Sequence, residues 1–270
     1  MTILHTALAL VPLALYLGAA TLVVRAVRAD PTARPLSAVV VAQAGVLVHA
    51  ALLFRAIDSP GGVTIAITDS ASLVGWVIGA TTAIALGFTA LGALSSVLLV
   101  LAGLLATLTG LLGGLSEVDV PHWELTAHIA LAALAAGWLT IAVTAVLLLS
   151  WQDARVRARK PMGSLALLPP METMERTLFQ AIGGGFVVLT LALVTGLFFV
   201  HDLIAQHLAH KVAFAFLAWV VFAVLLVGRA RYGWRGRQAR RLTVAGFVFL
   251  AVAYFGAKFV LENVLGRHWG

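Results

Sequence analysis

Apolar runs of membrane-spanning length follow one another along the chain and are separated by short polar segments. Each run is long enough to cross about 30 Å of hydrocarbon as an α-helix. The pattern predicts eight transmembrane helices, at about residues 3–24, 37–54, 72–91, 94–112, 126–150, 177–200, 211–228 and 242–261. The join between the third and fourth runs carries no charge and is the boundary that the pattern defines least. The predicted fold is therefore an all-α polytopic membrane protein.

The segments between the runs are too short for a soluble domain. The longest of them, residues 151–176, holds about 26 residues. The first run has His5 near its start and arginines behind it, the reverse of a secretory signal, so we expect it to be retained as a span. We therefore expect one integral membrane domain over residues 1–270.

Composition supports this class and excludes several kinds of site. Hydrophobic residues make up 61% of the chain and charged residues only 11%, too few polar groups to cover a water-soluble core. The absence of cysteine excludes disulfides, thiolate metal sites, iron–sulfur clusters and haem attached through a CxxCH motif. The net charge of +7 is explained by membrane topology rather than by nucleic-acid binding.

The basic residues predict the orientation of the chain in the membrane. Residues 25–36, 151–176 and 229–241 hold three, five and six of the 18 Lys and Arg residues, and with eight spans they lie on one side. Cytoplasmic loops carry such an excess, so we expect these loops in the cytoplasm and both termini outside.

All eight histidines then fall in the outer half of the protein: His5, His49, His122, His128, His201, His207, His210 and His268. His49 and His128 lie inside spans, each roughly 9–10 Å below the outer rim. An imidazole at that depth needs a partner, either a metal such as haem iron or a polar side chain across a helix interface. Gln43 and Thr126 are available for the second interpretation.

No motif for catalysis or phosphate binding appears, since HExxH, GxSxG, Walker and GxGxxG patterns are all missing. An enzyme is therefore the less favoured class. Two other functions stay open. One is a small-solute or proton-coupled transporter in which His49, His128 and Lys258 relay protons. The other is a non-catalytic membrane scaffold whose arginine-rich loops bind anionic lipid.

Several short motifs are similar to those of a known family. They are His122-Trp123 followed by His128, Gly185-Phe186, Leu189-Thr190, Thr195-Gly196, Lys211 followed by Trp219, Gly233-Trp234-Arg235-Gly236 and Tyr254-Phe255-Gly256. From the fifth span onward, over about half of its length, the chain resembles the CcsA-type cytochrome c assembly proteins, most closely their short YpjD-like branch.

The resemblance implies an assembly factor of the bacterial inner membrane, rather than a turnover enzyme, that handles haem b at the outer face during cytochrome c maturation. The implied partners are haem, an apocytochrome c or another membrane assembly subunit, and membrane lipid. The candidate haem-binding residues are His49, His128, His201, His210 and His268. We expect His49 and His128 to share the iron in an outward-facing pocket that His201 or His210 closes.

Two departures from the family pattern concern haem directly. The family's tryptophan-rich loop corresponds to the segment between Gly196 and Lys211, which contains no tryptophan here. Val227 stands where the haem-transporting members carry a histidine late in the seventh span. These departures bear on whether the protein presents haem as those members do.

Overall fold

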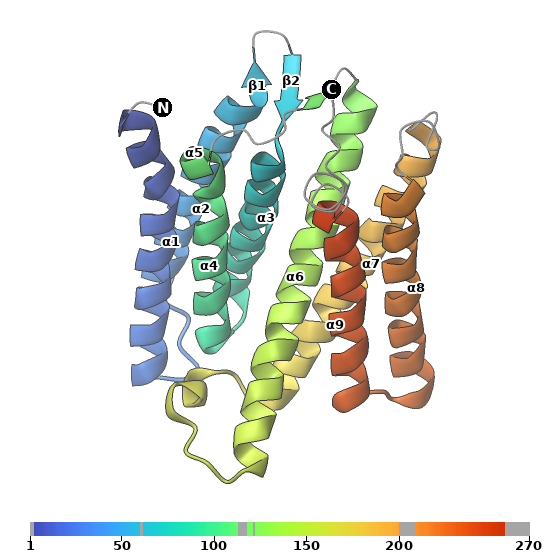
Figure 1. Ribbon diagram of the computed structural model, residues 1–270. Coiled ribbons are helices and arrows are strands. Elements are labelled where there is room, and N and C mark those ends of the chain that lie inside the picture. Colours follow the sequence, from blue (N-terminus) through green and yellow to red (C-terminus); the bar gives the residue numbers. More distant parts are fainter. Residues whose placement is uncertain (1–2, 60–61, 113–117, 121, 200–208, 257–270) are drawn as a thin grey trace. The chain divides into compact units, whose positions relative to one another are not determined.

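The structure is a computed structural model that describes residues 3–59, 62–112, 118–120, 122–199 and 209–256 (Figure 1). It divides into two compact units. Unit 1 comprises Met1–Trp123 and Leu148–Thr177, and unit 2 comprises Glu124–Leu147 and Leu178–Gly270.

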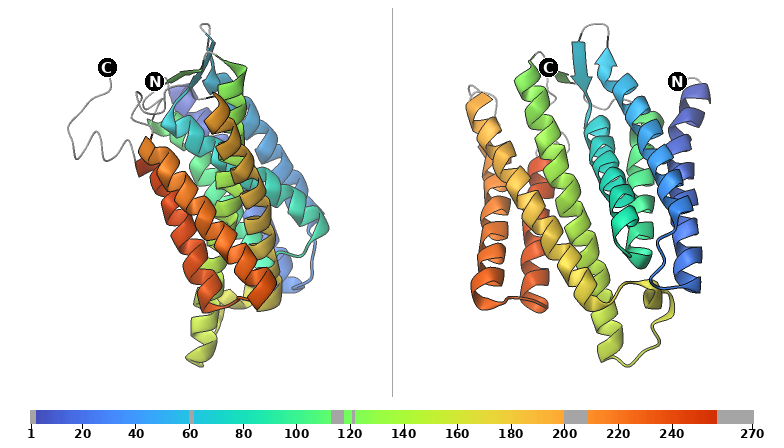
Figure 2. Two further views of the ribbon diagram at one scale, coloured as in Figure 1. Left: turned by 90° about the vertical axis from the view of Figure 1, so that its right-hand side faces the viewer. Right: turned by 180° about the vertical axis from the view of Figure 1, so that it is seen from behind.

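Unit 1 is built on a bundle of four antiparallel helices. They are α1 (Ile3–Ala29), α2 (Leu36–Ile57), α3 (Ile67–Phe88) and α4 (Gly92–Ala106), and a one-turn helix α5 (Leu108–Leu112) follows α4. Helix α1 packs against α2 and α4, and α3 packs against the same two helices, so the four form a closed ring (Figures 1 and 2). The interior of this ring is the core of unit 1.

Tyr16 of α1 lies at the centre of the ring and is fully buried. Glycines of the three other helices surround it. A Cβ atom at Gly45 would lie 3.2 Å from the ring of Tyr16, and one at Gly79 would lie 2.5 Å from the Tyr16 hydroxyl. A Cβ atom at Gly103 would lie 3.4 Å from the Cβ atom of Tyr16. Small residues let transmembrane helices approach closely, and here they make room for one large side chain.

A small antiparallel sheet, which the hydropathy pattern did not predict, lies at one end of unit 1. It has the order β1 (Asp58–Ser59), β2 (Gly62–Ile65), β3 (Val118–Val120). Val63 pairs with both Asp58 and Val120, so the sheet joins the α2–α3 connection to the segment that precedes α6. Strands this short and this far apart in sequence leave no periodic signal.

Helices α6 (Trp123–Arg157) and α7 (Met171–Phe199) contribute to both units, and the 3-10 helix η1 (Gly163–Leu167) lies between them. Helix α6 continues well past residue 150, where the apolar run ends. Its polar extension contains an ion pair one turn apart, with Arg157 Nε 3.0 Å from Asp153 Oδ1. Such i, i+4 pairs favour continuation of the helix.

Unit 2 contains the remainder of α6 and α7 together with α8 (Ala209–Tyr232), α9 (Arg237–Ala251) and the π-helical turn η2 (Val252–Gly256). Glycines again allow large side chains into helix interfaces. Trp138 of α6 packs on Gly184 of α7, and Phe222 of α8 packs on Gly246 of α9.

Among the described residues, seven helices are long and apolar enough to cross a membrane: Ala7–Ala29, Leu36–Ile57, Ile67–Phe88, Gly92–Leu112, Trp123–Arg157, Met171–Phe198 and Lys211–Tyr232. They confirm the prediction of an all-α polytopic membrane protein. The eighth predicted span, residues 242–261, corresponds to α9 and η2, and the description ends at Gly256. The count of eight spans and the outward orientation of both termini therefore stay predictions.

Candidate functional site

His49 lies in the core of unit 1, on α2, with only 1% of its surface exposed. Its Nε2 atom is 2.9 Å from Ser72 Oγ of α3, and its Nδ1 atom is 3.4 Å from the hydroxyl oxygen of Tyr16 on α1. The two rings meet edge to face, with centroids 6.1 Å apart. His49 thus joins three helices of the bundle through polar contacts.

Both ring nitrogens of His49 are used by these contacts. A neutral imidazole has one N–H group and one lone pair, so one hydroxyl donates to His49 and the other accepts from it. Ligation of a metal would require one of the two contacts to be given up. The partners are Tyr16 and Ser72, rather than the Gln43 and Thr126 that the sequence offered.

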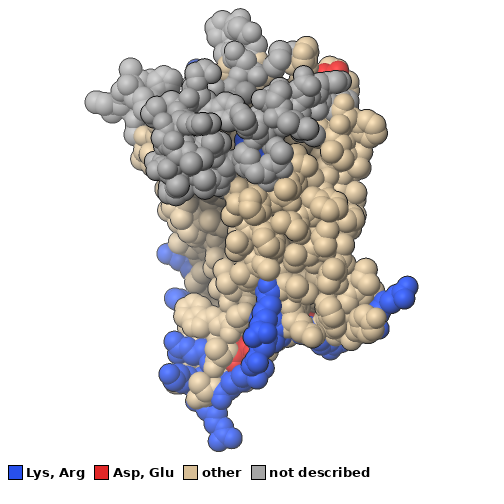
Figure 3. Space-filling view, turned by 45° about the vertical axis from the view of Figure 1, so that its right-hand side comes forward, with Lys and Arg blue, Asp and Glu red and all other residues tan. Residues whose placement is uncertain are grey.

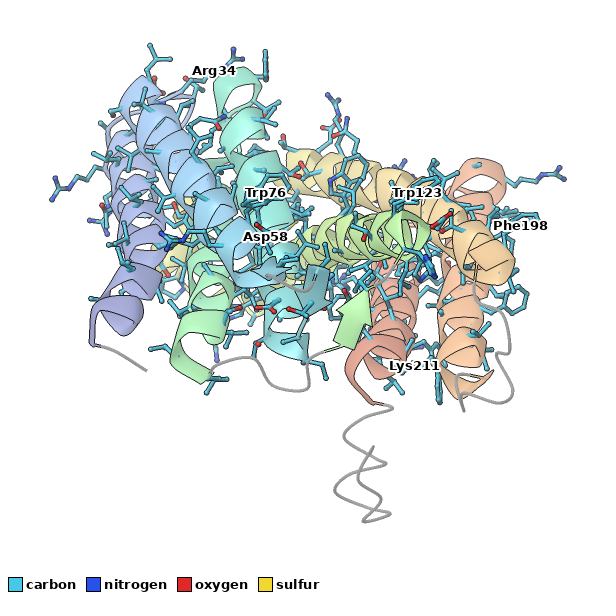
Figure 4. All side chains as sticks on the ribbon, turned by 90° about the horizontal axis from the view of Figure 1, so that it is seen from above. Arg34, Asp58, Trp76, Trp123, Phe198 and Lys211 are labelled. Carbon is cyan, nitrogen blue, oxygen red and sulfur yellow. The ribbon has the colours of Figure 1, made fainter. Side chains whose placement is uncertain are left out.

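Asp69 is a further buried polar residue of unit 1 that the sequence analysis did not single out. It lies on α3, three residues before Ser72, and its Oδ2 atom accepts the backbone N–H of Ala66 at 2.9 Å. Its Oδ1 atom is buried and has no hydrogen-bond partner in the described part of the chain. One turn beyond Ser72, Trp76, labelled in Figure 4, donates its indole N–H to the carbonyl oxygen of Val46 at 3.1 Å.

His128 lies in unit 2, on α6, and is half-buried. Its Nδ1 atom is 3.2 Å from Thr195 Oγ1 of α7. The Thr195 hydroxyl also lies 3.0 Å from the backbone carbonyl oxygens of Leu191 and Ala192. A hydroxyl has a single proton, and here it is donated in hydrogen bonds to the helix carbonyl oxygens. Thr195 Oγ1 therefore accepts a hydrogen bond from His128 Nδ1–H.

This tautomer leaves the lone pair of His128 on Nε2. A histidine that ligates a metal usually donates its other ring N–H to a neighbouring acceptor, which fixes the orientation of the ring. Thr195 supplies that acceptor. Gly196 leaves space for the ring, since a Cβ atom there would lie 3.0 Å from His128 Cε1. The local structure around His128 therefore fits an iron ligand.

An aromatic cluster contacts α7 on the N-terminal side of Thr195. Trp219 of α8 donates its indole N–H to Thr190 Oγ1 at 2.9 Å. Its ring stacks on Phe186 and on Phe216, with centroid distances of 5.4 and 5.8 Å. Thr190 and Thr195 are five residues apart on α7, a rise of about 7.5 Å. Residues of five separate sequence motifs, those with His128, Phe186, Thr190, Thr195 and Trp219, thus make their contacts along one helix of unit 2.

The remaining candidate ligands are described less fully. His201 and His268 lie outside the described residues, and only the backbone of His210, in the first turn of α8, is described. His49 belongs to unit 1 and His128 to unit 2, and each has its contacts inside its own unit. The proposed sharing of one iron by these two histidines stays a prediction. Within the described ranges, no group of three or more His, Asp or Glu residues could hold a metal ion.

The sequence that contains the contacts of His128 and Trp219 matches a known protein family. Residues 62–265 match the family described as "Cytochrome C assembly protein". The chain belongs to the cytochrome c assembly protein family. The matched range contains His128, Thr195 and Trp219, but it begins after α2 and so leaves out Tyr16 and His49.

Curated relatives agree with the resemblance seen in the motifs. The inner membrane protein YpjD of Escherichia coli (strain K12) is 36% identical over 149 residues, which are 54% of this chain and 56% of YpjD. The cytochrome c biogenesis protein CcsA of Picosynechococcus sp. is 30% identical over 117 residues, 43% of this chain and 33% of that protein. The match to YpjD therefore spans about half the length of either protein. No solved structure matches the chain.

Proposed function

We propose that this protein handles haem b at the outer face of the bacterial inner membrane during cytochrome c assembly, as a binding factor rather than a turnover enzyme. Family membership and the inner membrane location of the relative YpjD support the setting. The observation that carries the proposal is His128, with Nδ1–H donated to Thr195 and an Nε2 lone pair left for iron. Bound iron would gain an imidazole ligand whose basicity that hydrogen bond raises.

The second axial ligand in this proposal is a histidine of the outer segments, His201, His210 or His268. His49 is the alternative. For His49 to ligate iron, its ring must release Ser72 or Tyr16, which would leave a buried hydroxyl without its partner. We place His201, His210 and His268 first because ligation by His49 carries this cost.

An absorption spectrum of the full-length protein, purified from haem-replete cells, tests the proposal. We expect a low-spin, six-coordinate haem b spectrum that becomes high-spin or disappears in His128→Ala. His5→Ala, near the N-terminus, is the control and should leave the spectrum unchanged. His49→Ala should also leave it unchanged if an outer histidine is the second ligand. A colourless wild-type protein would refute haem binding.

Thr195→Val separates a ligand from a structural histidine at position 128. Valine removes the Thr195 hydroxyl, one of two acceptors for the His128 ring beside the backbone of Ala192, but keeps nearly the same volume, so the helix interface should persist. If His128 binds iron, the haem reduction potential should change while the spectrum stays low-spin. An unchanged potential in a protein that binds haem would show that the Thr195 hydroxyl does not tune the ligand.

The orientation is part of the same proposal, because haem at the outer face requires the histidine-rich ends outside. We propose eight spans with both termini outside. A reporter active only outside the membrane should be active when fused after Gly270 and silent when inserted at residues 232–236. The opposite result would refute the proposed orientation of the C-terminal part of the chain.

A second candidate, a proton-coupled transporter, is favoured by the buried polar contacts of unit 1. His49 between two hydroxyls can exchange its donor and acceptor nitrogens, and intramembrane ionisable residues often mark proton paths. Proteoliposomes with an internal pH-sensitive dye would test this. Proton uptake that disappears in His49→Gln and Asp69→Asn would support the transporter, and its absence in wild type would exclude it.

A further inference from the structure

Gln43 of α2 is a polar residue of unit 1 that takes no part in the site described above. It lies on the third turn of α2, inside the predicted span 37–54. The sequence offered it as a partner for His49, but the structure gives His49 other partners. Gln43 is half-buried, and its amide has no hydrogen bond to any residue that the structure describes.

An unpaired amide is unfavourable at this depth of a membrane. Neither water nor lipid tails can replace its hydrogen bonds inside the hydrocarbon. Gln43 is about 9 Å from the nearer end of the predicted span, at residue 37, which is farther than its side chain reaches. In membranes, glutamine side chains form hydrogen bonds across helix interfaces. Gln43 therefore calls for a partner on a helix that the described contacts do not include.

The residues around Gln43 form an exposed stripe along α2. We call it the α2 stripe, and it consists of Leu36, Val40, Gln43, Leu47, Ala50 and Phe54. The spacing alternates between four and three residues, which places all six on one face of the helix. The four large apolar members are between 67% and 77% exposed. Contact with lipid accounts for these apolar side chains, but it does not account for the glutamine among them.

The α2 stripe is complementary to itself. Two copies of the chain have the same orientation in the membrane, so a two-fold axis that relates them runs along the membrane normal. That axis pairs α2 with α2 in parallel, and each residue of the stripe then faces its own copy. The amide of Gln43 contains both a donor and an acceptor, so two of these amides can bond to each other reciprocally. A second copy thus supplies the partner that Gln43 lacks.

No charge opposes this pairing within the stripe. From Leu36 to Phe54, α2 contains no Lys, Arg, Asp or Glu. Arg55 is exposed, but it lies about 100° around the helix from Phe54 and so does not face its own copy. Figure 3, which shows another face of the molecule, also has Lys and Arg gathered towards one end of the helices. The small side chain of Ala50 lets two helices approach closely.

We propose that two copies of this protein associate through their α2 stripes, with the two Gln43 amides hydrogen-bonded to each other across the interface. In coiled coils, a single polar residue in an apolar seam likewise fixes the register and the number of helices. The match to the cytochrome c assembly family begins at residue 62, after α2, so this interface belongs to the part of the chain outside that match. The association is independent of haem and holds whether or not His128 binds iron.

The chain contains no cysteine, so single cysteines can report the pairing in intact membranes. Leu47→Cys places a thiol in the α2 stripe, and Val48→Cys places one about 100° away on the same helix. We expect oxidation with copper phenanthroline to cross-link Leu47→Cys into a product of twice the monomer mass and to leave Val48→Cys monomeric. Val40→Cys and Val41→Cys repeat the comparison one heptad earlier.

Three results of this cross-linking would overturn the proposal. Equal cross-linking of Leu47→Cys and Val48→Cys would show random collision between copies. A product of another mass would show that a different protein covers the stripe. Absence of any cross-linked product would show that the stripe faces lipid or another part of the same chain.

A second measurement tests the role of the amide. Energy transfer between copies with donor and acceptor fluorophores at the C-terminus, measured as proteoliposomes are diluted with lipid, gives the dissociation constant of the dimer. Gln43→Leu keeps a similar volume but removes both hydrogen bonds, and should raise the dissociation constant about tenfold. Gln43→Asn retains an amide and should raise it less.

Two matched truncations complete this measurement. Leu47→Ala removes an exposed side chain of the α2 stripe and should also weaken the dimer. Ile84→Ala removes one from α3, where Ile84 is 56% exposed, and should leave the dissociation constant unchanged. Circular dichroism checks that each variant is folded. An unchanged dissociation constant in folded Gln43→Leu, or equal effects of Leu47→Ala and Ile84→Ala, would overturn the proposed interface.

Discussion

Gly79→Ala tests whether Tyr16 organises the core of unit 1. The new methyl group would lie 2.5 Å from the Tyr16 hydroxyl oxygen, 2.8 Å from Cζ and 3.0 Å from Cε1. None of these positions is acceptable, so the Tyr16 ring must move, although it is buried among four helices. Movement of the ring also disturbs its hydrogen bond to His49.

The net effect follows from three opposing contributions. Replacing a helical glycine by alanine stabilises a helix by up to about 1 kcal/mol. Overpacking a tight core costs about 1–3 kcal/mol. The Tyr16–His49 hydrogen bond is long, at 3.4 Å, so we assign it no more than the average for hydrogen bonds between membrane helices. Its loss therefore adds roughly 0.6 kcal/mol to the destabilisation. We therefore expect Gly79→Ala to lower the free energy of unfolding by about 1–2 kcal/mol.

Gly87→Ala on the same helix is the matched control, because a Cβ atom there meets nothing within 4 Å. It should be neutral or stabilising. Tyr16→Phe removes the atom nearest to the new methyl, so Gly79→Ala should cost less in that background, with a coupling of roughly 0.5–1 kcal/mol. Unfolding in mixed detergent micelles, followed by tryptophan fluorescence, gives these values. Equal stability of the Gly79 and Gly87 variants, or no coupling to Tyr16→Phe, would refute this account of the core.

Two other perturbations are expected to act outside this core. Gly228→Ala should destabilise unit 2 by about 1–3 kcal/mol, because the methyl group would overlap the indole of Trp234, and a thermal shift unchanged from wild type would contradict the observed packing. The N–H and hydroxyl of Thr32 donate to Asp30 and hold the pKa of that carboxyl below its usual range. Ionised Asp30 therefore stabilises the folded protein slightly. This stabilisation is complete above the pKa of the unfolded state, near 4, and is lost as pH falls through the lower pKa of the folded state. Asp30→Asn should remove this acid dependence in unfolding measured between about pH 2 and 5.

Hydropathy and short motifs determined the class, most of the spans and the family of this protein. Each apolar run must cover the hydrocarbon by itself and satisfy its own backbone as a helix, so the runs that predicted spans at 37–54 and 211–228 lie within α2 and α8. Charge placement predicts the orientation of the chain, because insertion depends on local loops rather than on packing. The motifs with His128, Trp219 and Trp234 identified the family for the same reason, since they are local in sequence.

Helix ends and side-chain partners were decided by tertiary structure. Helix α3 begins at Ile67 rather than near residue 72, because Asp69 accepts the N–H of Ala66 and the strand before it pairs with a distant one. The hydropathy pattern contains no information about either contact.

The environment of His49 shows most clearly what the sequence alone does not determine. Its position inside a span follows from counting residues, and that position predicted either a metal or a polar side chain as its partner. Which partner it finds depends on how α1, α2 and α3 rotate about their axes, and this is set by the glycines that admit Tyr16 at the centre of the bundle. Because Tyr16 is 33 and Ser72 23 residues from His49 along the chain, only the packed bundle brings their side chains together.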